Sequence, residues 1–164
     1  MCGIGAILDP AGTSGQDAAE RMVEALRHRG PDGEALRRIG PVALAHTRLA
    51  IIDVAGGDQP LDSEDGRVTA IVNGEIYNHR ELRARLGEPY EFQTASDCEV
   101  ILALWREKGV TLLDDLDGIF AFALWDGEQR RYLIARDPVG VVPLYWGRDA
   151  RGQLFVASEL KALE

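Results

Sequence analysis

The hydrophobic residues of this chain fall into short runs that are rich in β-branched and aromatic side chains, and turn residues end most of these runs. Runs of this kind predict β-strands. We expect one strand in GIGAILD (3–9) and one in RVTAIVNG (67–74). The stretch 35–52 predicts two further short strands, which Gly40 and Pro41 divide.

Two later segments place a turn between apolar runs and therefore predict hairpins. In the stretch 118–137, Asp126 and Gly127 stand between the two runs. The stretch 142–158 repeats the pattern around residues 149–152. Asp-Gly is a strong hairpin signal, and the two strands of a hairpin pair antiparallel.

Three stretches have the apolar spacing or the end signals of helices. In the stretch 17–28, the apolar side chains recur at helical spacing and share one face. The stretches 78–87 and 96–109 begin with Asn78 and Ser96, and each has a glutamate three residues later. This spacing is typical of a capping box, and the glycine that ends each stretch is a usual stop signal.

Together these elements predict an α+β fold with at least six strands and three helices. Several strands are apolar on both faces, and GIFAFALW (118–125) barely alternates. Strands of this kind require cover on both sides. We therefore expect two stacked antiparallel sheets with helices outside them. The 164 residues suffice for one domain with its own core, and no repeat, low-complexity tract or linker divides them.

Composition excludes several classes of protein. The formal net charge is −9, and the arginines are dispersed among acidic residues, which argues against a nucleic-acid partner and against a membrane surface. No apolar run approaches the roughly 20 residues of a spanning helix, and no signal peptide is recognisable. The two cysteines and three histidines have no metal-site spacing, so we expect no metal. The expected compartment is the reducing cytoplasm.

Cys2 directly follows the initiator methionine. Its simplest interpretation is a small buried residue that opens a strand, because buried free cysteine is common. Methionine is usually trimmed before a small residue, however, and trimming would leave a thiol and a free α-amine on one residue. An α-amine has a pKa of about 8 and can act as a base near neutral pH. Cys2 is therefore a candidate N-terminal nucleophile.

Other polar residues have both a structural and a functional interpretation. Arg48 is either a strand-edge residue or, through its planar guanidinium, a carboxylate binder. Asn73 and Gly74 precede the predicted helix by a few residues, so we expect them at a strand-to-helix corner, as a plain turn or as an oxyanion hole. Asp97 is favoured by the helix dipole but can also bind an ammonium group. Cys98 is expected in the core.

An ordered set of motifs runs along the chain. They are MCGI (1–4), RHRGPDG (27–33), HTRLAIID (46–53), GGDQPL (56–61), VNGEIYNHRELR (72–83), SDCEVILALW (96–105), LDGIFAFALWD (116–126), ARDPVGVVPLYWG (135–147) and ASELKAL (157–163). Over essentially its whole length the chain resembles the N-terminal glutaminase domain of glutamine-hydrolysing asparagine synthetases. These are class II glutamine amidotransferases of the N-terminal-nucleophile (Ntn) hydrolase type. The resemblance implies a four-layer αββα sandwich.

The resemblance also implies roles for individual residues toward L-glutamine. Cys2, after loss of Met1, is the implied nucleophile, and its α-amine is the base and later the acid. The Asn73 side chain and the Gly74 N–H are the implied oxyanion hole. The implied substrate-binding residues are Arg48 for the α-carboxylate, the backbone of Leu49, Ala50, Ile51 and Ile52 along that side, and Glu75 and Asp97 for the α-ammonium.

The implied reaction is hydrolysis of the glutamine side-chain amide through a thioester, and the ammonia passes to a synthetase domain that amidates aspartate. The implied glutaminase reaction uses no cofactor, whereas ATP and Mg are expected only for the synthetase domain. No Walker A motif occurs, and TSGQD (13–17) departs from the family's Ser-Gly-Gly-x-Asp-Ser loop. We therefore expect residues 1–164 to be a glutaminase domain that lacks its C-terminal end and the synthetase domain.

Other partners and functions stay open at this point. The synthetase domain belongs either to the same full-length chain or to a separate subunit. Uncovered edge strands would favour a homodimer. A glutaminase domain can also serve another acceptor, such as a sugar phosphate, a phosphoribosyl donor or a natural-product acid. The alternative of a different class is a non-catalytic glutamine-binding module.

Overall fold

Two antiparallel sheets form the centre of the computed structural model, which describes residues 1–9, 16–87 and 90–164. The strands are β1 (Gly3–Leu8), β2 (Gly33–Ile39), β3 (Val42–Arg48), β4 (Leu61–Asp62), β5 (Val68–Ile76), β6 (Gly118–Asp126), β7 (Arg131–Arg136), β8 (Tyr145–Arg148) and β9 (Leu154–Ala157). One sheet has the order β2-β3-β1-β9-β8, and the other has the order β4-β5-β6-β7.

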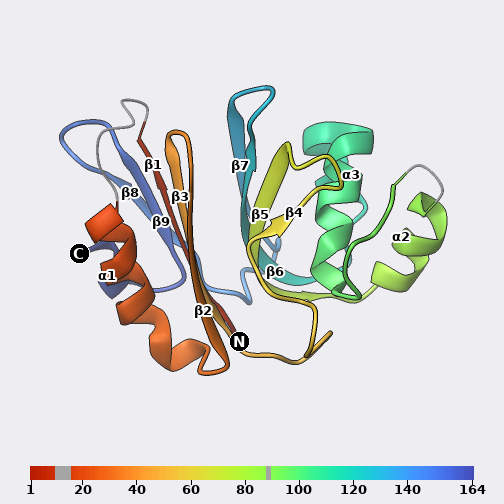
Figure 1. Ribbon diagram of the computed structural model, residues 1–164, viewed down its shortest axis with the longest axis horizontal. Helices are drawn as coiled ribbons and strands as arrows, with labels where there is room; N and C mark the ends of the chain where they lie inside the picture. Colours follow the sequence, from red (N-terminus) through yellow and green to blue (C-terminus); the bar gives the residue numbers. More distant parts are fainter. Residues whose placement is uncertain (10–15, 88–89) are drawn as a thin grey trace.

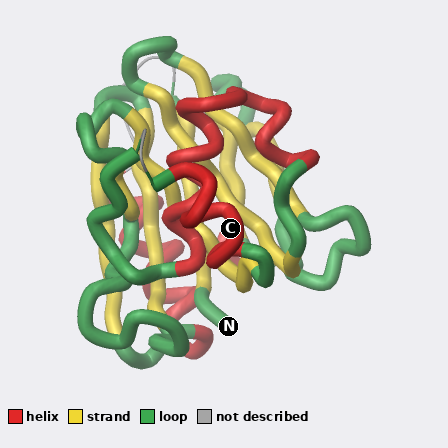
Figure 2. Tube along the Cα trace, turned by 90° about the vertical axis from the view of Figure 1, so that its right-hand side faces the viewer, coloured by secondary structure: helices red, strands yellow, loops and turns green. Residues whose placement is uncertain are grey.

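Helices cover the outer face of each sheet. They are α1 (Gln16–Leu26), α2 (His79–Leu86) and α3 (Val100–Lys108), with the 3-10 helices η1 (Arg27–Arg29), η2 (Asp97–Glu99), η3 (Gly109–Asp114) and η4 (Leu160–Leu163). In Figure 1, α1 lies outside the five-stranded sheet, and α2 and α3 lie outside the four-stranded sheet. Figure 2 is turned so that α2 and α3 face the viewer, with strands behind the helices. The predicted α+β sandwich of four layers is confirmed.

The hydrophobic core follows these layers, with one cluster under α1, one between the sheets and one under α2 and α3. Both faces of strand β6 are buried, which explains why polar and apolar residues barely alternate in GIFAFALW. Phe120 and Phe122 pack toward the helices, whereas Ala121 and Ala123 face the other sheet. Burying both faces of this strand contributes to two separate parts of the core, so no polar face is needed.

The predicted hairpins are confirmed, but the predicted strand-to-helix corner is wrong. Strand β5 continues through Asn73 and Gly74 to Ile76, and these two residues pair with Ala121 and Phe120 of β6. The ladder with β6 continues past the Asn-Gly pair, because the partner strand supplies backbone hydrogen bonds that a local turn would otherwise provide.

The helix-start predictions had mixed outcomes. The Ser96 hydroxyl accepts a hydrogen bond from the Cys98 N–H at 3.3 Å, as expected of a cap. The Asn78 side chain makes no cap bond. It donates instead to the Asp115 carbonyl (2.8 Å) and accepts from the Asp117 N–H (3.1 Å). Contacts with this distant segment thus replace the predicted local cap.

Two further observations concern membrane-spanning helices and the TSGQD string. None of the helices in the described part of the chain is long and apolar enough to cross a membrane. Residues 13–15 of the TSGQD string lie outside the described residues.

Candidate functional site

A cavity of about 70 Å³ lies where the start of β1, the end of β3 and the middle of β5 come together. Its lining contains every predicted site residue except Ala50: Cys2, Arg48, Leu49, Ile51, Ile52, Asn73, Gly74, Glu75 and Asp97. The N–H of Ala50 donates to the Asp32 carboxylate at 2.9 Å. The fold thus gathers residues from four separate parts of the sequence at one place.

Cys2 stands immediately before β1 and is half-buried. Its Sγ accepts a hydrogen bond from the Leu49 N–H at 3.3 Å and lies 3.6 Å from the Leu49 carbonyl oxygen, to which the thiol donates. Met1 also lines the cavity and is 48% exposed. While Met1 is attached, the nitrogen of Cys2 belongs to a peptide bond and has no basic lone pair.

Arg29 and Glu159 form a chain of polar contacts that ends at the backbone carbonyl of Cys2. The Arg29 guanidinium donates to the Cys2 carbonyl (2.9 Å) and to the Glu159 carboxylate (2.9 Å). Hydrogen bonds from Arg29, His28 and Lys161 lower the pKa of Glu159 to about 2, so this carboxylate is ionised at neutral pH. Sequence reasoning assigned no individual role to Arg29 or to Glu159. The only available signal was that both residues fall within the ordered motifs.

Asn73 is fully buried, and neither its Nδ2 nor its Oδ1 has a hydrogen-bond partner among the described residues. A buried amide without partners is costly and calls for an explanation. The neighbouring Val72 is held in place, because the Gln59 side chain donates to its carbonyl (3.0 Å) and accepts from its N–H (2.6 Å). The position of Asn73 is therefore enforced by its strand while its own amide stays available to a ligand.

Any other residue at position 74 would require the backbone of β5 or β6 to shift. Its φ of +139° lies in a region that side chains rarely adopt, and an added Cβ would stand 2.1 Å from the Ile119 carbonyl oxygen. This close approach of β5 to β6 places the Gly74 backbone at the cavity wall, beside the Asn73 amide.

Arg48 is nearly buried at the end of β3, and the loop that follows it wraps its guanidinium. Its nitrogens donate to the Asp53 carbonyl (2.6 Å), the Val54 carbonyl (3.0 Å) and the Asp58 carboxylate (2.8 Å). A planar fork of donors can make these contacts simultaneously, which fixes the position of the positive charge.

The acidic residues of the cavity come from other elements. Asp97, in η2, is buried, and its Oδ2 accepts a hydrogen bond from the Ile76 N–H at 2.8 Å. Glu75 stands on β5, half-buried, one residue after Gly74. The cavity therefore combines one fixed guanidinium with two carboxyl groups.

Cys98 is the second cysteine of the cavity lining, and it belongs to the core as predicted. Burial raises the pKa of its thiol well above the usual range, and the nearby Asp97 and Cys2 raise it further. A neutral thiol is a poor nucleophile. Of the two cysteines, Cys2 is therefore the one expected to react with an electrophile.

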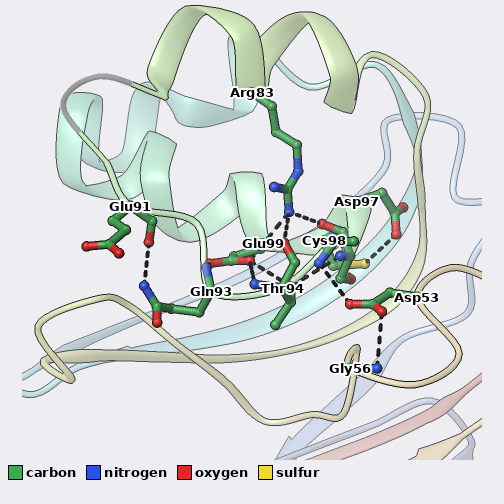
Figure 3. Close-up of polar contacts among 11 residues, drawn as sticks. Asp53, Gly56, Arg83, Glu91, Gln93, Thr94, Asp97, Cys98 and Glu99 are labelled. Atoms are coloured by element: carbon green, nitrogen blue, oxygen red, sulfur yellow. Dashed lines mark hydrogen bonds and ion pairs between the residues drawn. The ribbon is translucent and has the colours of Figure 1, made fainter.

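A buried network supports the segment that leads into Asp97 (Figure 3). The Glu99 carboxylate, 1% exposed, accepts hydrogen bonds from the Gln93 N–H (2.7 Å) and from both the N–H and the hydroxyl of Thr94 (2.8 and 2.6 Å). Arg83 lies 3.4 Å from the same carboxylate and donates to the Ser96 carbonyl at 2.9 Å. Each buried charge thus has polar partners, as burial demands.

Among the residues that the structure describes, no group of three or more His, Cys, Asp or Glu side chains is arranged to hold a metal ion.

Residues 1–164 match the family model described as "Glutamine amidotransferase domain". Asparagine synthetase B [glutamine-hydrolyzing] of Escherichia coli (strain K12) is 52% identical over 99% of the chain, and Asparagine synthetase [glutamine-hydrolyzing] 1 of Arabidopsis thaliana is 49% identical over 99%. The chain spans 30% of the first of these relatives and 28% of the second.

The fold also resembles a solved structure. The glutamine phosphoribosylpyrophosphate amidotransferase from B. subtilis, complexed with ADP and GMP, superposes with a TM-score of 0.81 at 24% sequence identity. The match covers 98% of this chain and 42% of that chain. At this level of identity the similarity shows a shared fold.

Proposed function

The chain belongs to the glutamine amidotransferase domain family, and from this premise we propose that it hydrolyses the side-chain amide of L-glutamine to glutamate and ammonia. The observation that carries the proposal is the buried Asn73 amide, which has no hydrogen-bond partner within residues 1–9, 16–87 and 90–164 and lines the same cavity as Cys2. A donor kept free at a cavity wall is what a developing oxyanion requires.

The reaction begins at Cys2 after Met1 has been removed. The free α-amine takes the thiol proton, and the thiolate attacks the amide carbon of glutamine. The oxyanion of the tetrahedral intermediate accepts hydrogen bonds from the Asn73 Nδ2 and the Gly74 N–H. When the C–N bond breaks, the α-ammonium returns its proton to the leaving ammonia. Water then hydrolyses the γ-glutamyl thioester, which releases glutamate and the Cys2 thiol.

Removal of Met1 has a second consequence in this proposal. The cavity of about 70 Å³ is much smaller than typical ligand pockets, which measure roughly 300–1,000 Å³. Met1 is one of the residues that line it. Processing of the N-terminus therefore both frees the base and widens the space in front of Cys2.

The charges of the cavity match the two ends of an α-amino acid. Arg48 pairs with the α-carboxylate, and Glu75 and Asp97 pair with the α-ammonium. The backbone of residues 49–52, which comprises Leu49, Ala50, Ile51 and Ile52, lines the carboxylate side. The side-chain amide of glutamine then reaches Cys2.

The use of the ammonia is proposed from the relatives. Two of them are named glutamine-hydrolysing asparagine synthetases, and this chain spans 30% or less of their length. We infer that residues 1–164 act as the glutaminase domain beside a synthetase domain, in the same chain or in another subunit, that amidates aspartate with ATP and Mg. The inferred compartment is the cytoplasm.

The test combines intact-mass measurement with a glutamine-to-glutamate assay. The expected result is a mature protein without Met1 that releases glutamate, and no release from Cys2→Ala. Cys98→Ala is the matched control and should keep its activity, because the Cys98 thiol is neutral and buried. A diazo-ketone analogue of glutamine should label the N-terminal peptide. Labelling of the Cys98 peptide, or activity with Met1 still attached, would contradict the proposal.

A further inference from the structure

Asp53 contacts both the Arg48 guanidinium and the segment that precedes Asp97, although it does not line the cavity. Its φ is +50°, a left-handed conformation that in the described part of the chain only one other non-glycine residue, Arg130, shares. Aspartate tolerates this conformation better than most residues, but it is still uncommon and is often found at functional sites. The backbone here is held by contacts on two sides.

On the first side, Asp53 closes the loop around the guanidinium of Arg48. Its carbonyl oxygen accepts hydrogen bonds from the Arg48 Nη2 (2.6 Å) and from the Gly57 N–H (2.8 Å). Its Oδ1 accepts from the Gly56 N–H at 3.1 Å. The loop from Asp53 to Gly57 is therefore closed by hydrogen bonds that converge on Asp53, and Arg48 donates one of them.

On the second side, Asp53 holds the segment that carries Asp97. Its Oδ2 accepts a hydrogen bond at 2.8 Å from the N–H of Ala95, a residue 42 positions later in the chain. Figure 3 shows the Asp53 carboxylate between Gly56 and the segment of Thr94 and Asp97. The Glu99 network fixes this segment from its other side.

We propose that Asp53 is a positioning residue that joins the Arg48 loop to the Asp97 segment, so that the two grip the α-carboxylate and the α-ammonium of glutamine as one rigid clamp. This inference rests on the proposed function. An amino-acid zwitterion has its two charges at a fixed separation, so two independently moving loops would have to be ordered when it binds. Linking them in advance lowers that cost.

The role does not depend on neutralising Arg48. The carboxylate partner of that guanidinium is Asp58, whose side chain is 83% exposed. The two carboxylate oxygens of Asp53 instead bind backbone N–H groups of two different segments. Asparagine has only one acceptor oxygen and also tolerates a positive φ, so Asp53→Asn breaks one of the two links and keeps the backbone conformation.

The experiment compares steady-state glutamine hydrolysis by the full processed chain with that of Asp53→Asn. We expect the KM for glutamine to rise about tenfold, the effect of one lost charge-assisted hydrogen bond, while kcat changes less than about threefold. Asp149→Asn is the matched control. The Asp149 Oδ1 accepts from the Arg151 and Gln153 N–H groups in the β8–β9 turn, and its loss should leave both constants unchanged.

A double-mutant cycle separates positioning from general loosening. In an Asp97→Asn background, Asp53→Asn should raise KM by less than about threefold, because the segment it positions no longer carries the binding charge. Additive effects, or an unchanged KM in Asp53→Asn alone, would overturn the inference.

Binding measurements keep the two proposals apart. Calorimetry of L-glutamine with the Cys2→Ala protein, with and without Asp53→Asn, should show about tenfold weaker binding for the double variant. A wild-type protein that hydrolyses glutamine with an Asp53→Asn protein of equal KM and equal affinity refutes only the role of Asp53. A wild-type protein that releases no glutamate refutes the proposed function, and the binding ratio then still tests Asp53.

Discussion

At the scale of single residues, Asn73 is the clearest case of a side chain that serves the cavity at the expense of the fold. Its amide is buried with no partner in the described part of the chain, whereas both ends of the Asn78 amide, five positions later, form hydrogen bonds. The two asparagines are therefore a matched pair for comparing the proposed catalytic role of Asn73 with the structural role of Asn78.

We predict that Asn73→Ala slows glutamine hydrolysis by about 100- to 1,000-fold, the usual cost of one oxyanion donor. The same variant should unfold at an unchanged or higher urea concentration, because it removes an unsatisfied buried group. Asn78→Ala should do the opposite, with lower stability and near-normal kcat. Equal kcat in the two variants would exclude Asn73 from the oxyanion hole.

The second prediction at this scale concerns Arg48. Its guanidinium uses two nitrogens for three separate acceptors, and the single nitrogen of lysine cannot reproduce that fork. Arg48→Lys should therefore raise the KM for glutamine about tenfold or more although the charge is kept. Initial-rate measurements over a range of glutamine concentrations test this, and a KM within twofold of wild type would contradict it.

At the scale of elements, Gly74 allows β5 to approach β6 closely. This approach places Asn73 and Gly74 of β5 at the wall of the cavity. The conformation of Gly74 and its contact with the Ile119 carbonyl leave no space for a side chain. Gly152, in the β8–β9 turn, shares the positive φ but has nothing within 4 Å of an added Cβ. Alanine substitutions at Gly74 and Gly152 therefore distinguish the cost of a strained φ from the cost of a steric clash with β6.

We predict that Gly152→Ala lowers the free energy of unfolding by about 1 kcal/mol, the cost of the strained φ alone. Gly74→Ala should cost at least about 2 kcal/mol more, because β5 and β6 must also move apart. Urea unfolding monitored by circular dichroism gives both values. Similar losses for the two variants would mean that the β5–β6 contact is not tight.

At the scale of the whole molecule, the interior between the sheets carries a titratable group. His46, on β3, is 1% exposed, and its buried Nε2 has no hydrogen-bond partner among the described residues. Burial lowers its pKa to about 4, an effect that Arg48 reinforces and that Val72 and Asp58 oppose. The interior thus holds a histidine whose imidazole is neutral at pH 7.

This histidine makes stability depend on pH. In the unfolded chain His46 titrates near its ordinary pKa of about 6.5. Between about pH 6.5 and pH 4 the unfolded chain binds a proton that the folded chain does not, so stability falls as the pH is lowered through this range. The total loss is on the order of 3 kcal/mol. Urea unfolding between pH 8 and pH 4 should show this slope, and His46→Gln should flatten it.

A carboxylate provides the control in a different pH range. The pKa of Glu159 is lowered to about 2, so its contribution is complete above the unfolded pKa of about 4.5 and is lost as the pH falls toward 2. Glu159→Gln should therefore leave the slope between pH 6.5 and pH 4.5 unchanged. If it flattens that slope as His46→Gln does, the assignment to His46 is wrong.

Sequence reasoning predicted most of the elements because their signals are local. Alternating or two-faced apolar runs, Asp-Gly turns and the Ser96 cap depend on neighbours in the chain, and the structure contains the corresponding strands, hairpins and helix start. The ordered motifs identified the family, and the candidate residues that they implied, except Ala50, line one cavity.

Only the tertiary structure decided the features that depend on distant partners. The continuation of β5 through Asn73 and Gly74 needs β6, and the Asn78 amide is engaged by residues 115–117. The bridge from Asp53 to Ala95 and the contacts of Arg29 with Cys2 and Glu159 join residues 27 to 130 positions apart. A sequence pattern reports what a residue prefers beside its neighbours, whereas these contacts arise from packing two sheets together, which no local preference encodes.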